Sequence, residues 1–232
     1  MVASWLVTAV LAIGVVAGAR TLAVFKSQSE KRRTARFTEV AGALGLTYSE
    51  TPPPDFTIEP IRSFKLFTQG KPRGIEQVMR GQPYGYSLAV FDYVYVWTLL
   101  GVQLERRRPV PIECTVVWHW SPALRLPRFR VHPKGLDHAI GEIVGYPSVD
   151  LPGQPYFSDA YVLQGDPSVA NVFGGQLAAY LERLHLDHVD VAIEGGGGQV
   201  LCYSWQRRVA GDDLREFVDH TIAVITMLHA RR

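Results

Sequence analysis

The chain has 232 residues, of which 47% are hydrophobic and 20% are charged, and its formal net charge is +2. This composition is that of a folded globular chain, and it excludes an intrinsically disordered protein, which has few apolar residues and a high net charge. A net charge this close to zero, with no recognised nucleic-acid-binding motif, also argues against a nucleic-acid partner.

The charge is distributed unevenly along the chain. Residues 1–134 contain 18 Lys and Arg against 9 Asp and Glu, a net charge of +9, whereas residues 135–232 contain 6 against 13, a net charge of −7. A basic first half suits a protein that lies beside anionic lipids. The alternative is that the two halves neutralise each other when the chain folds.

Residues 5–25 (WLVTAVLAIGVVAGARTLAVF) form a long apolar stretch that Arg20 alone interrupts with a charge. A helix needs about 20 apolar residues to cross the hydrocarbon core of a bilayer, so we expect a single transmembrane helix within residues 1–25. The alternatives are a cleaved signal peptide, for which residues 17–19 offer a small-residue cleavage site, and a helix buried in a globular fold. A signal peptide is disfavoured because no basic residue precedes the apolar stretch.

Residues 26–36, which follow this stretch, are basic, with Glu30 as their one acidic residue. The basic residues are Lys26, Lys31, Arg32, Arg33 and Arg36. The positive-inside rule then predicts an N-terminus outside the cell membrane and a cytoplasmic domain. The two cysteines, Cys114 and Cys202, lie in apolar runs typical of buried thiols in a reducing compartment. A disulfide between neighbouring strands is the alternative if the orientation is reversed.

The first half of the chain predicts one helix and then strands. Apolar residues spaced i, i+3, i+4 and i+7 before Gly45 indicate a helix over residues 29–44, within a basic juxtamembrane segment at 26–50. Alternating or β-branched runs between turn signals predict an antiparallel meander of strands at 63–68, 74–80, 84–98 and 112–120.

The second half predicts helices and strands in turn. Strands are expected at 128–132, 161–164, 189–193 and 199–205, helices at 136–144, 169–184 and 212–230, and an irregular loop at 146–157. The expected fold class is α+β, a transmembrane helix followed by an antiparallel sheet with helices packed on it. Residues 51–232 form the soluble domain, with two possible sub-blocks at 51–125 and 126–232.

Asp92 is the strongest catalytic candidate because it interrupts an apolar strand. A carboxylate there must be paired, exposed at a bulge, or functional, and pairing with an arginine such as Arg62, Arg73 or Arg80 on a neighbouring strand is the simplest explanation. Ser158, Asp159 and His185 are further candidates for a membrane-tethered hydrolase or transferase. The sequence contains no G-x-S-x-G, H-E-x-x-H or cysteine–base motif, so we do not expect an enzyme.

Two other segments superficially resemble ligand sites. His185, Asp187, His188 and Asp190 are close in sequence, but histidine near a helix C-terminus is favoured by the helix dipole alone. Residues 195–198, four glycines, are followed by a strand rather than the helix that a phosphate loop requires, which indicates a hairpin turn. We therefore expect no metal and no cofactor.

The basic residues predict a membrane-surface site, in which each Lys or Arg near anionic lipid contributes about 1 kcal/mol. The set comprises Lys26, Lys31, Arg32, Arg33, Arg36, Arg106, Arg107 and Arg108. The alternative is that these charges are simply solvated.

The order of several short motifs resembles that of uncharacterised bacterial membrane-anchored proteins. The motifs are Phe64-x-Leu66-Phe67-x-x-Gly70, Val78-Met79-Arg80-Gly81, Phe91-Asp92-Tyr93-x-Tyr95, Leu126-Pro127-x-Phe129, Phe157-Ser158-x-x-Tyr161-x-Leu163-x-Gly165 and Val191-x-Ile193-Glu194-x-Gly196. The resemblance covers roughly residues 37–228 and implies a layout and a membrane location, without implying a reaction. The expected function is binding, with the lipid bilayer, a membrane protein, a small ligand or a second copy of the chain as partner.

Overall fold

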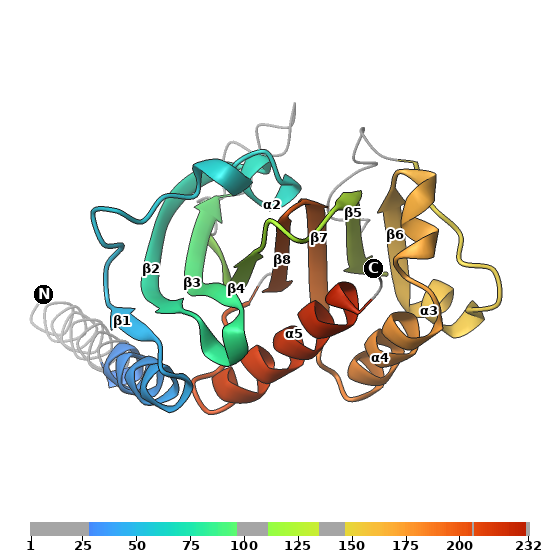
Figure 1. The fold of residues 1–232 in the computed structure, drawn as a ribbon. Helices are drawn as coiled ribbons and strands as arrows, with labels where there is room; N and C mark the ends of the chain where they lie inside the picture. Colours follow the sequence, from blue (N-terminus) through green and yellow to red (C-terminus); the bar gives the residue numbers. More distant parts are fainter. Residues whose placement is uncertain (1–27, 97–110, 135–146, 206, 231–232) are drawn as a thin grey trace, which may run out of the picture.

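The computed structural model describes residues 28–96, 111–134, 147–205 and 207–230 (Figure 1). Within these residues, eight strands form one antiparallel sheet in the order β1-β2-β3-β4-β8-β7-β5-β6. The strands are β1 (Thr47–Ser49), β2 (Lys71–Gly81), β3 (Ser87–Val96), β4 (Pro111–Trp120), β5 (Leu126–Pro133), β6 (Tyr161–Gly165), β7 (Val191–Gly197) and β8 (Gln199–Ser204).

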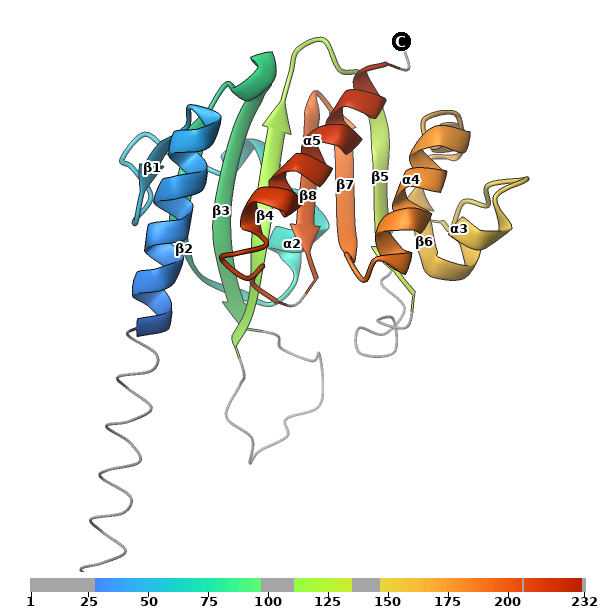
Figure 2. The same cartoon turned by 90° about the horizontal axis from the view of Figure 1, so that it is seen from below.

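Three helices lie side by side on one face of this sheet (Figure 2). They are the N-terminal helix (residues 28–44), α5 (Leu214–His229) and α4 (Gly175–Leu186). The short helices α3 (Pro155–Ala160) and η4 (Pro167–Asn171) flank β6 and α4, and η2 (Pro83–Gly85) joins β2 to β3. On the opposite face lie η1 (Glu59–Ile61) and α2 (Lys65–Thr68).

Apolar side chains are buried on both faces of the central strands. Leu88 and Val90 of β3 pack against the helices, while Phe91 and Tyr93 of the same strand pack in a second cluster with Phe67 of α2. A strand covered on both faces has no polar face. This explains why β3 is apolar at nearly every position, with Asp92 as its one charged residue.

The two predicted sub-blocks contribute to one sheet. β4, from residues 51–125, pairs with β8, from residues 126–232, in the register Val117↔Cys202. Cys114 and Cys202 are free thiols, and burial raises the pKa of both. They belong to the core clusters on opposite faces of the sheet, so they do not form the disulfide considered above.

Some predicted elements differ from the observed ones. Residues 63–68, expected as a strand, contain α2, because the carboxylate of the distant Glu194 accepts hydrogen bonds from the first amides of that helix. The first strand of the meander is instead β1. The expected helix at 169–184 is divided at Gly174 into η4 and α4, and α3 occupies part of the expected loop. The helix expected at 136–144 lies outside the described residues.

The expected transmembrane helix, and with it the single-pass fold class, must be corrected. Within the described residues no helix is both long and apolar enough to cross a bilayer, and the expected span at 5–25 lies outside them. The 16-residue helix α5, for example, is about 24 Å long, short of a ~30 Å hydrocarbon core, and it is amphipathic. The predicted location, with the N-terminus outside and the domain in the cytoplasm, is corrected by the same finding.

Gly70 is required for the close contact between the start of β2 and the end of β3. Its φ is +69°, and a Cβ at this position would collide with the backbone carbonyl oxygen of Val96. We expect Gly70→Ala to lower the free energy of unfolding by about 2–3 kcal/mol, since it combines left-handed backbone strain with a steric clash. Gly153→Ala is the control: its φ is +83° but its Cβ would meet open space, so we expect a loss of about 1 kcal/mol in urea denaturation. Equal losses of unfolding free energy in Gly70→Ala and Gly153→Ala would contradict the proposed clash.

Candidate functional site

A buried ion pair joins the N-terminal helix to the sheet. Arg33 lies on the buried face of that helix, one turn before Phe37, and its guanidinium packs over the Phe37 ring at 5.0 Å. Its Nε donates to Oδ2 of Asp92 at 2.6 Å, and its Nη2 donates to Oδ1 at 2.7 Å. Asp92 is completely buried. This bidentate geometry is the strongest form of an arginine–carboxylate contact.

Thr115 and Val209 complete the hydrogen bonds around this ion pair. The Thr115 hydroxyl donates to Oδ1 of Asp92 at 2.9 Å and accepts from the Val209 amide at 3.0 Å. The Val209 carbonyl oxygen accepts from Nη1 of Arg33 at 2.5 Å. The backbone that leads from β8 to α5 is therefore tied to the same ion pair as the N-terminal helix.

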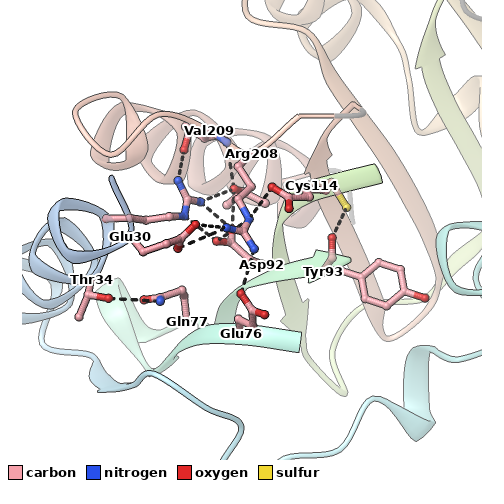
Figure 3. Close-up of polar contacts among 12 residues, drawn as sticks. Glu30, Thr34, Glu76, Gln77, Asp92, Tyr93, Cys114, Arg208 and Val209 are labelled. Atoms are coloured by element: carbon pink, nitrogen blue, oxygen red, sulfur yellow. Dashed lines mark hydrogen bonds and ion pairs between the residues drawn. The ribbon is translucent and has the colours of Figure 1, made fainter. Parts of the chain in front are cut away.

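Arg208 extends the cluster toward the surface (Figure 3). Its guanidinium lies 2.9 Å from Glu76, 3.1 Å from Glu113, 3.2 Å from Glu30 and 3.5 Å from Asp92. Burial by itself would lower the pKa of Arg208, but the four carboxylates outweigh burial and raise that pKa. We call Arg33, Asp92, Thr115 and Arg208, with Glu30, Glu76 and Glu113, the ion-pair network.

The ion-pair network connects the N-terminal helix, three strands and the segment before α5. A buried ion pair contributes little net stability compared with apolar packing. Removal of one partner is nevertheless costly, because it leaves an unpaired charge in the core. The network therefore fixes where the N-terminal helix docks on the sheet, and with it which face of the helix is exposed.

Three hollows border the ion-pair network. The first, about 800 Å³, lies between the N-terminal helix and residues 210–212. The second, about 720 Å³, is lined by Glu30, Glu113 and Arg208 among others. The third, about 430 Å³, lies where α5 begins and is lined by Arg208 and His220 among others. All three are lined by charged residues of both signs and by few large apolar side chains.

A second buried polar cluster lies on the opposite face of the sheet. The carboxylate of Glu194 accepts hydrogen bonds from the amides of Lys65 and Leu66, at 2.5 and 2.9 Å, and from the Tyr203 hydroxyl at 2.9 Å. Burial raises the pKa of Glu194, while Arg130 on the neighbouring strand β5, the Tyr203 hydroxyl and the two amides oppose that rise. We call these residues the Glu194 cluster, and its role is to hold α2 against the sheet.

The predicted membrane-surface residues fall into three groups. Lys31 and Arg32 are exposed on the first turns of the N-terminal helix. Arg33 is buried in the ion-pair network, and Arg36 pairs with Glu39 and Asp212 at 2.6 Å each. Lys26 and residues 106–108 lie outside the described residues. Of the predicted set, Lys31 and Arg32 are thus the basic side chains shown free to meet a surface.

The catalytic candidates do not converge. Asp92 is held by Arg33 in a bidentate ion pair, so the pairing explanation holds, although with an arginine other than Arg62, Arg73 or Arg80. Ser158 and Asp159 lie on α3 beside β6, and four strands separate β6 from β3 in the sheet. His185 is paired with Asp190 at 2.9 Å. The hydrolase or transferase interpretation has no assembled site among the described residues.

Metal and phosphate sites receive no support from the geometry. Among the described residues, no group of three or more His, Cys, Asp and Glu side chains is arranged to hold a metal ion. The glycines at 195–198 lie where β7 turns into β8, in the register Gly196↔Gln199.

One signal in the sequence points to the ion-pair network, and none points to the residues that pair with Asp92. Asp92 stands out because it is charged within an apolar strand. Its partner Arg33 is 59 residues away, on a helix that begins with several other basic residues. Arg208 lies beyond β8, so nothing local distinguishes either arginine.

Comparisons with known proteins identify the fold and no family. No protein-family model matches this chain, and no curated protein sequence matches it. The fold is similar to that in the crystal structure of the mycobacterial trehalose monomycolate transport factor A, TtfA, with a TM-score of 0.54. The identity is 13%, over 86% of this chain and 93% of that chain. The likeness extends over nearly the whole of both proteins and concerns the fold alone.

Proposed function

We propose that this chain is a non-catalytic binding protein that works at an anionic lipid surface, which it meets with the exposed basic side of the N-terminal helix. The observation that carries the proposal is the contrast between Arg33, buried in the ion-pair network, and its neighbours Lys31 and Arg32, which are exposed. The network fixes the rotation of the helix, so those two basic side chains are held outward.

The similar fold of TtfA supports a lipid-related role. TtfA is described as a transport factor for trehalose monomycolate, and the two folds match over 86% of this chain. The hollows that border the ion-pair network are lined mainly by charged and polar residues, so we assign to this chain contact with charged lipid head groups.

The contacts and positions of the catalytic candidates support binding rather than catalysis. Asp92 makes ion pairs or hydrogen bonds to Arg33, Arg208 and Thr115, which leaves its carboxylate no position from which to act on a substrate. Ser158 and Asp159 are several strands away from it. Binding is therefore the function that the arrangement supports best.

Flotation of the full chain with vesicles tests this proposal. We expect the chain to bind vesicles that contain anionic phospholipid more strongly than vesicles of neutral phosphatidylcholine. Lys31→Glu with Arg32→Glu is expected to lower the partition coefficient on anionic vesicles by at least about 30-fold, since two basic contacts contribute about 2 kcal/mol. High salt should reduce the binding of the unmodified chain in the same direction.

A matched charge reversal controls for the change in net charge. Arg125→Glu with Arg183→Glu alters two exposed arginines on other parts of the surface and is expected to change the partition coefficient by a few fold at most. Equal binding to anionic and neutral vesicles, or equal losses in the two double variants, would overturn the proposal.

A further inference from the structure

Two histidines meet where the end of α5 packs on β4. Nε2 of His119, on β4, lies 2.9 Å from Nε2 of His229, in the last turn of α5. His119 is only 1% exposed. The contact joins residues 110 positions apart and lies at the opposite end of α5 from the ion-pair network.

The partners of His119 define which of its nitrogens carries a proton. Its Nδ1 lies 3.0 Å from the carbonyl oxygen of Ser87, which can only accept a hydrogen bond. Nδ1 must therefore carry the hydrogen, and in the neutral ring Nε2 then has a free lone pair. His229 supplies the matching donor, an N–H on its Nε2. The contact requires His119 to be neutral.

The surroundings of His119 oppose a positive charge. The Tyr86 ring packs edge-on against His119 at 5.5 Å and lies 5.3 Å from the His229 ring. The neighbouring strand β8 places Val200 opposite His119. Burial lowers the pKa of His119 to about 4, His229 contributes in the same direction, and the Ser87 carbonyl opposes them.

We propose that His119 and His229 form a proton-sensitive clasp that holds the last turn of α5 on β4. A proton taken up by Nε2 of His119 replaces its lone pair with an N–H, so that two N–H donors face each other across the contact. The last turn of α5, which includes the buried Leu228, then separates from the sheet.

The direction of the pH dependence follows from the lowered pKa. A histidine whose pKa is lower in the folded protein contributes its full stability above the ordinary value of 6.5, and that contribution is lost as the pH falls toward 4. The clasp is therefore closed near neutral pH and opens in acid.

Hydrogen exchange in the full chain measures the opening. After correction for the intrinsic effect of pH, we expect exchange of the backbone amides at residues 226–229 to rise about 100-fold between pH 7 and pH 4, because each unit of pKa shift is a tenfold change in the opening equilibrium. Amides at the centre of β3 serve as the internal reference for global unfolding. Nitrogen NMR of the unmodified chain should show a neutral His119 with its hydrogen on Nδ1.

Two variants separate the clasp from general acid sensitivity. His229→Gln offers His119 an amide N–H when its Nε2 is unprotonated and an amide oxygen when its Nε2 is protonated, so we expect a smaller rise in exchange at the end of α5. His220→Gln is the matched control, since His220 is on the same helix but contacts Tyr180 instead, and it should keep the full rise. Exchange at the end of α5 that is independent of pH, or a His119 that titrates near 6.5, would overturn the proposal whether or not the variants fold.

Discussion

Replacement of Asp92 by alanine is expected to lower the free energy of unfolding by about 3–5 kcal/mol, the cost of leaving a buried charge without its partner. The Arg33 guanidinium would lose its bidentate partner and Arg208 one of its four carboxylates. The N-terminal helix should also dock less tightly, because Arg33 is its buried ionic contact to β3. Urea denaturation, followed by tryptophan fluorescence, measures this loss.

Asp55→Ala provides the comparison for this loss. Asp55 also pairs with an arginine, Arg80, at 2.8 Å, but it lies at the surface. Exposed ion pairs contribute about 0–1 kcal/mol, so the expected loss is at the limit of detection. If the two variants lost the same free energy, the ion-pair network would not be the buried contact that the geometry indicates.

Replacement of Glu194 by alanine is expected to have an effect of similar size, about 3–5 kcal/mol, on the other face of the sheet. The amides of Lys65 and Leu66 and the Tyr203 hydroxyl would lose their acceptor, and the charge of Arg130 would lose its nearby carboxylate. We expect α2 to detach, which hydrogen exchange at residues 65–68 would show alongside urea denaturation.

Asp166→Ala and Glu194→Gln refine this prediction. Asp166 is an exposed carboxylate that also accepts a hydrogen bond from a backbone amide, that of Ser168, so its loss should cost only about 1 kcal/mol, as for other helix caps.

Because burial raises the pKa of Glu194 above its ordinary 4.5, the contribution of this carboxyl to stability is fully present below pH 4.5 and declines as the pH rises through the raised value. Glu194→Gln should remove that decline; an unchanged pH profile would contradict the burial of an ionisable group there.

Local patterns predicted much of the sheet. The alternating and β-branched runs located β2, β3, β4, β5, β6, β7 and β8 to within a few residues, and the 3.6-residue periodicity located α5 and the N-terminal helix. These patterns report which faces are buried, and burial on both faces of β3 left a continuous apolar run in which Asp92 was conspicuous.

The elements that the sequence did not predict depend on distant residues. α2 forms from a segment that alternates like a strand, because Glu194, 128 residues from Leu66, accepts hydrogen bonds from its first amides. Arg33 was assigned to the surface with its basic neighbours, since nothing local reveals that Asp92 lies opposite it in the fold. The transmembrane expectation came from apolar length alone, and the helices that the structure describes do not meet the requirement for a span.

The ion-pair network and the proposed lipid-binding surface are linked through the N-terminal helix, which contributes residues to both. By fixing Arg33 inward, the network directs Lys31 and Arg32 outward at the start of the same helix. Loss of the network in Asp92→Ala should therefore weaken lipid binding as well as stability, whereas loss of the Glu194 cluster, on the opposite face of the sheet, should affect stability more than lipid binding.

Site-specific fluorescence quenching tests most directly whether this side of the N-terminal helix meets lipid. Ala35→Cys places a label beside Arg32, and Ala123→Cys places one beyond the far end of β4; both positions are exposed, and the native Cys114 and Cys202 are buried. With anionic vesicles that carry a quencher on the lipid head group, we expect strong quenching at position 35 and little at position 123. Equal quenching at both positions, or none at position 35 on vesicles that the chain binds, would contradict the account.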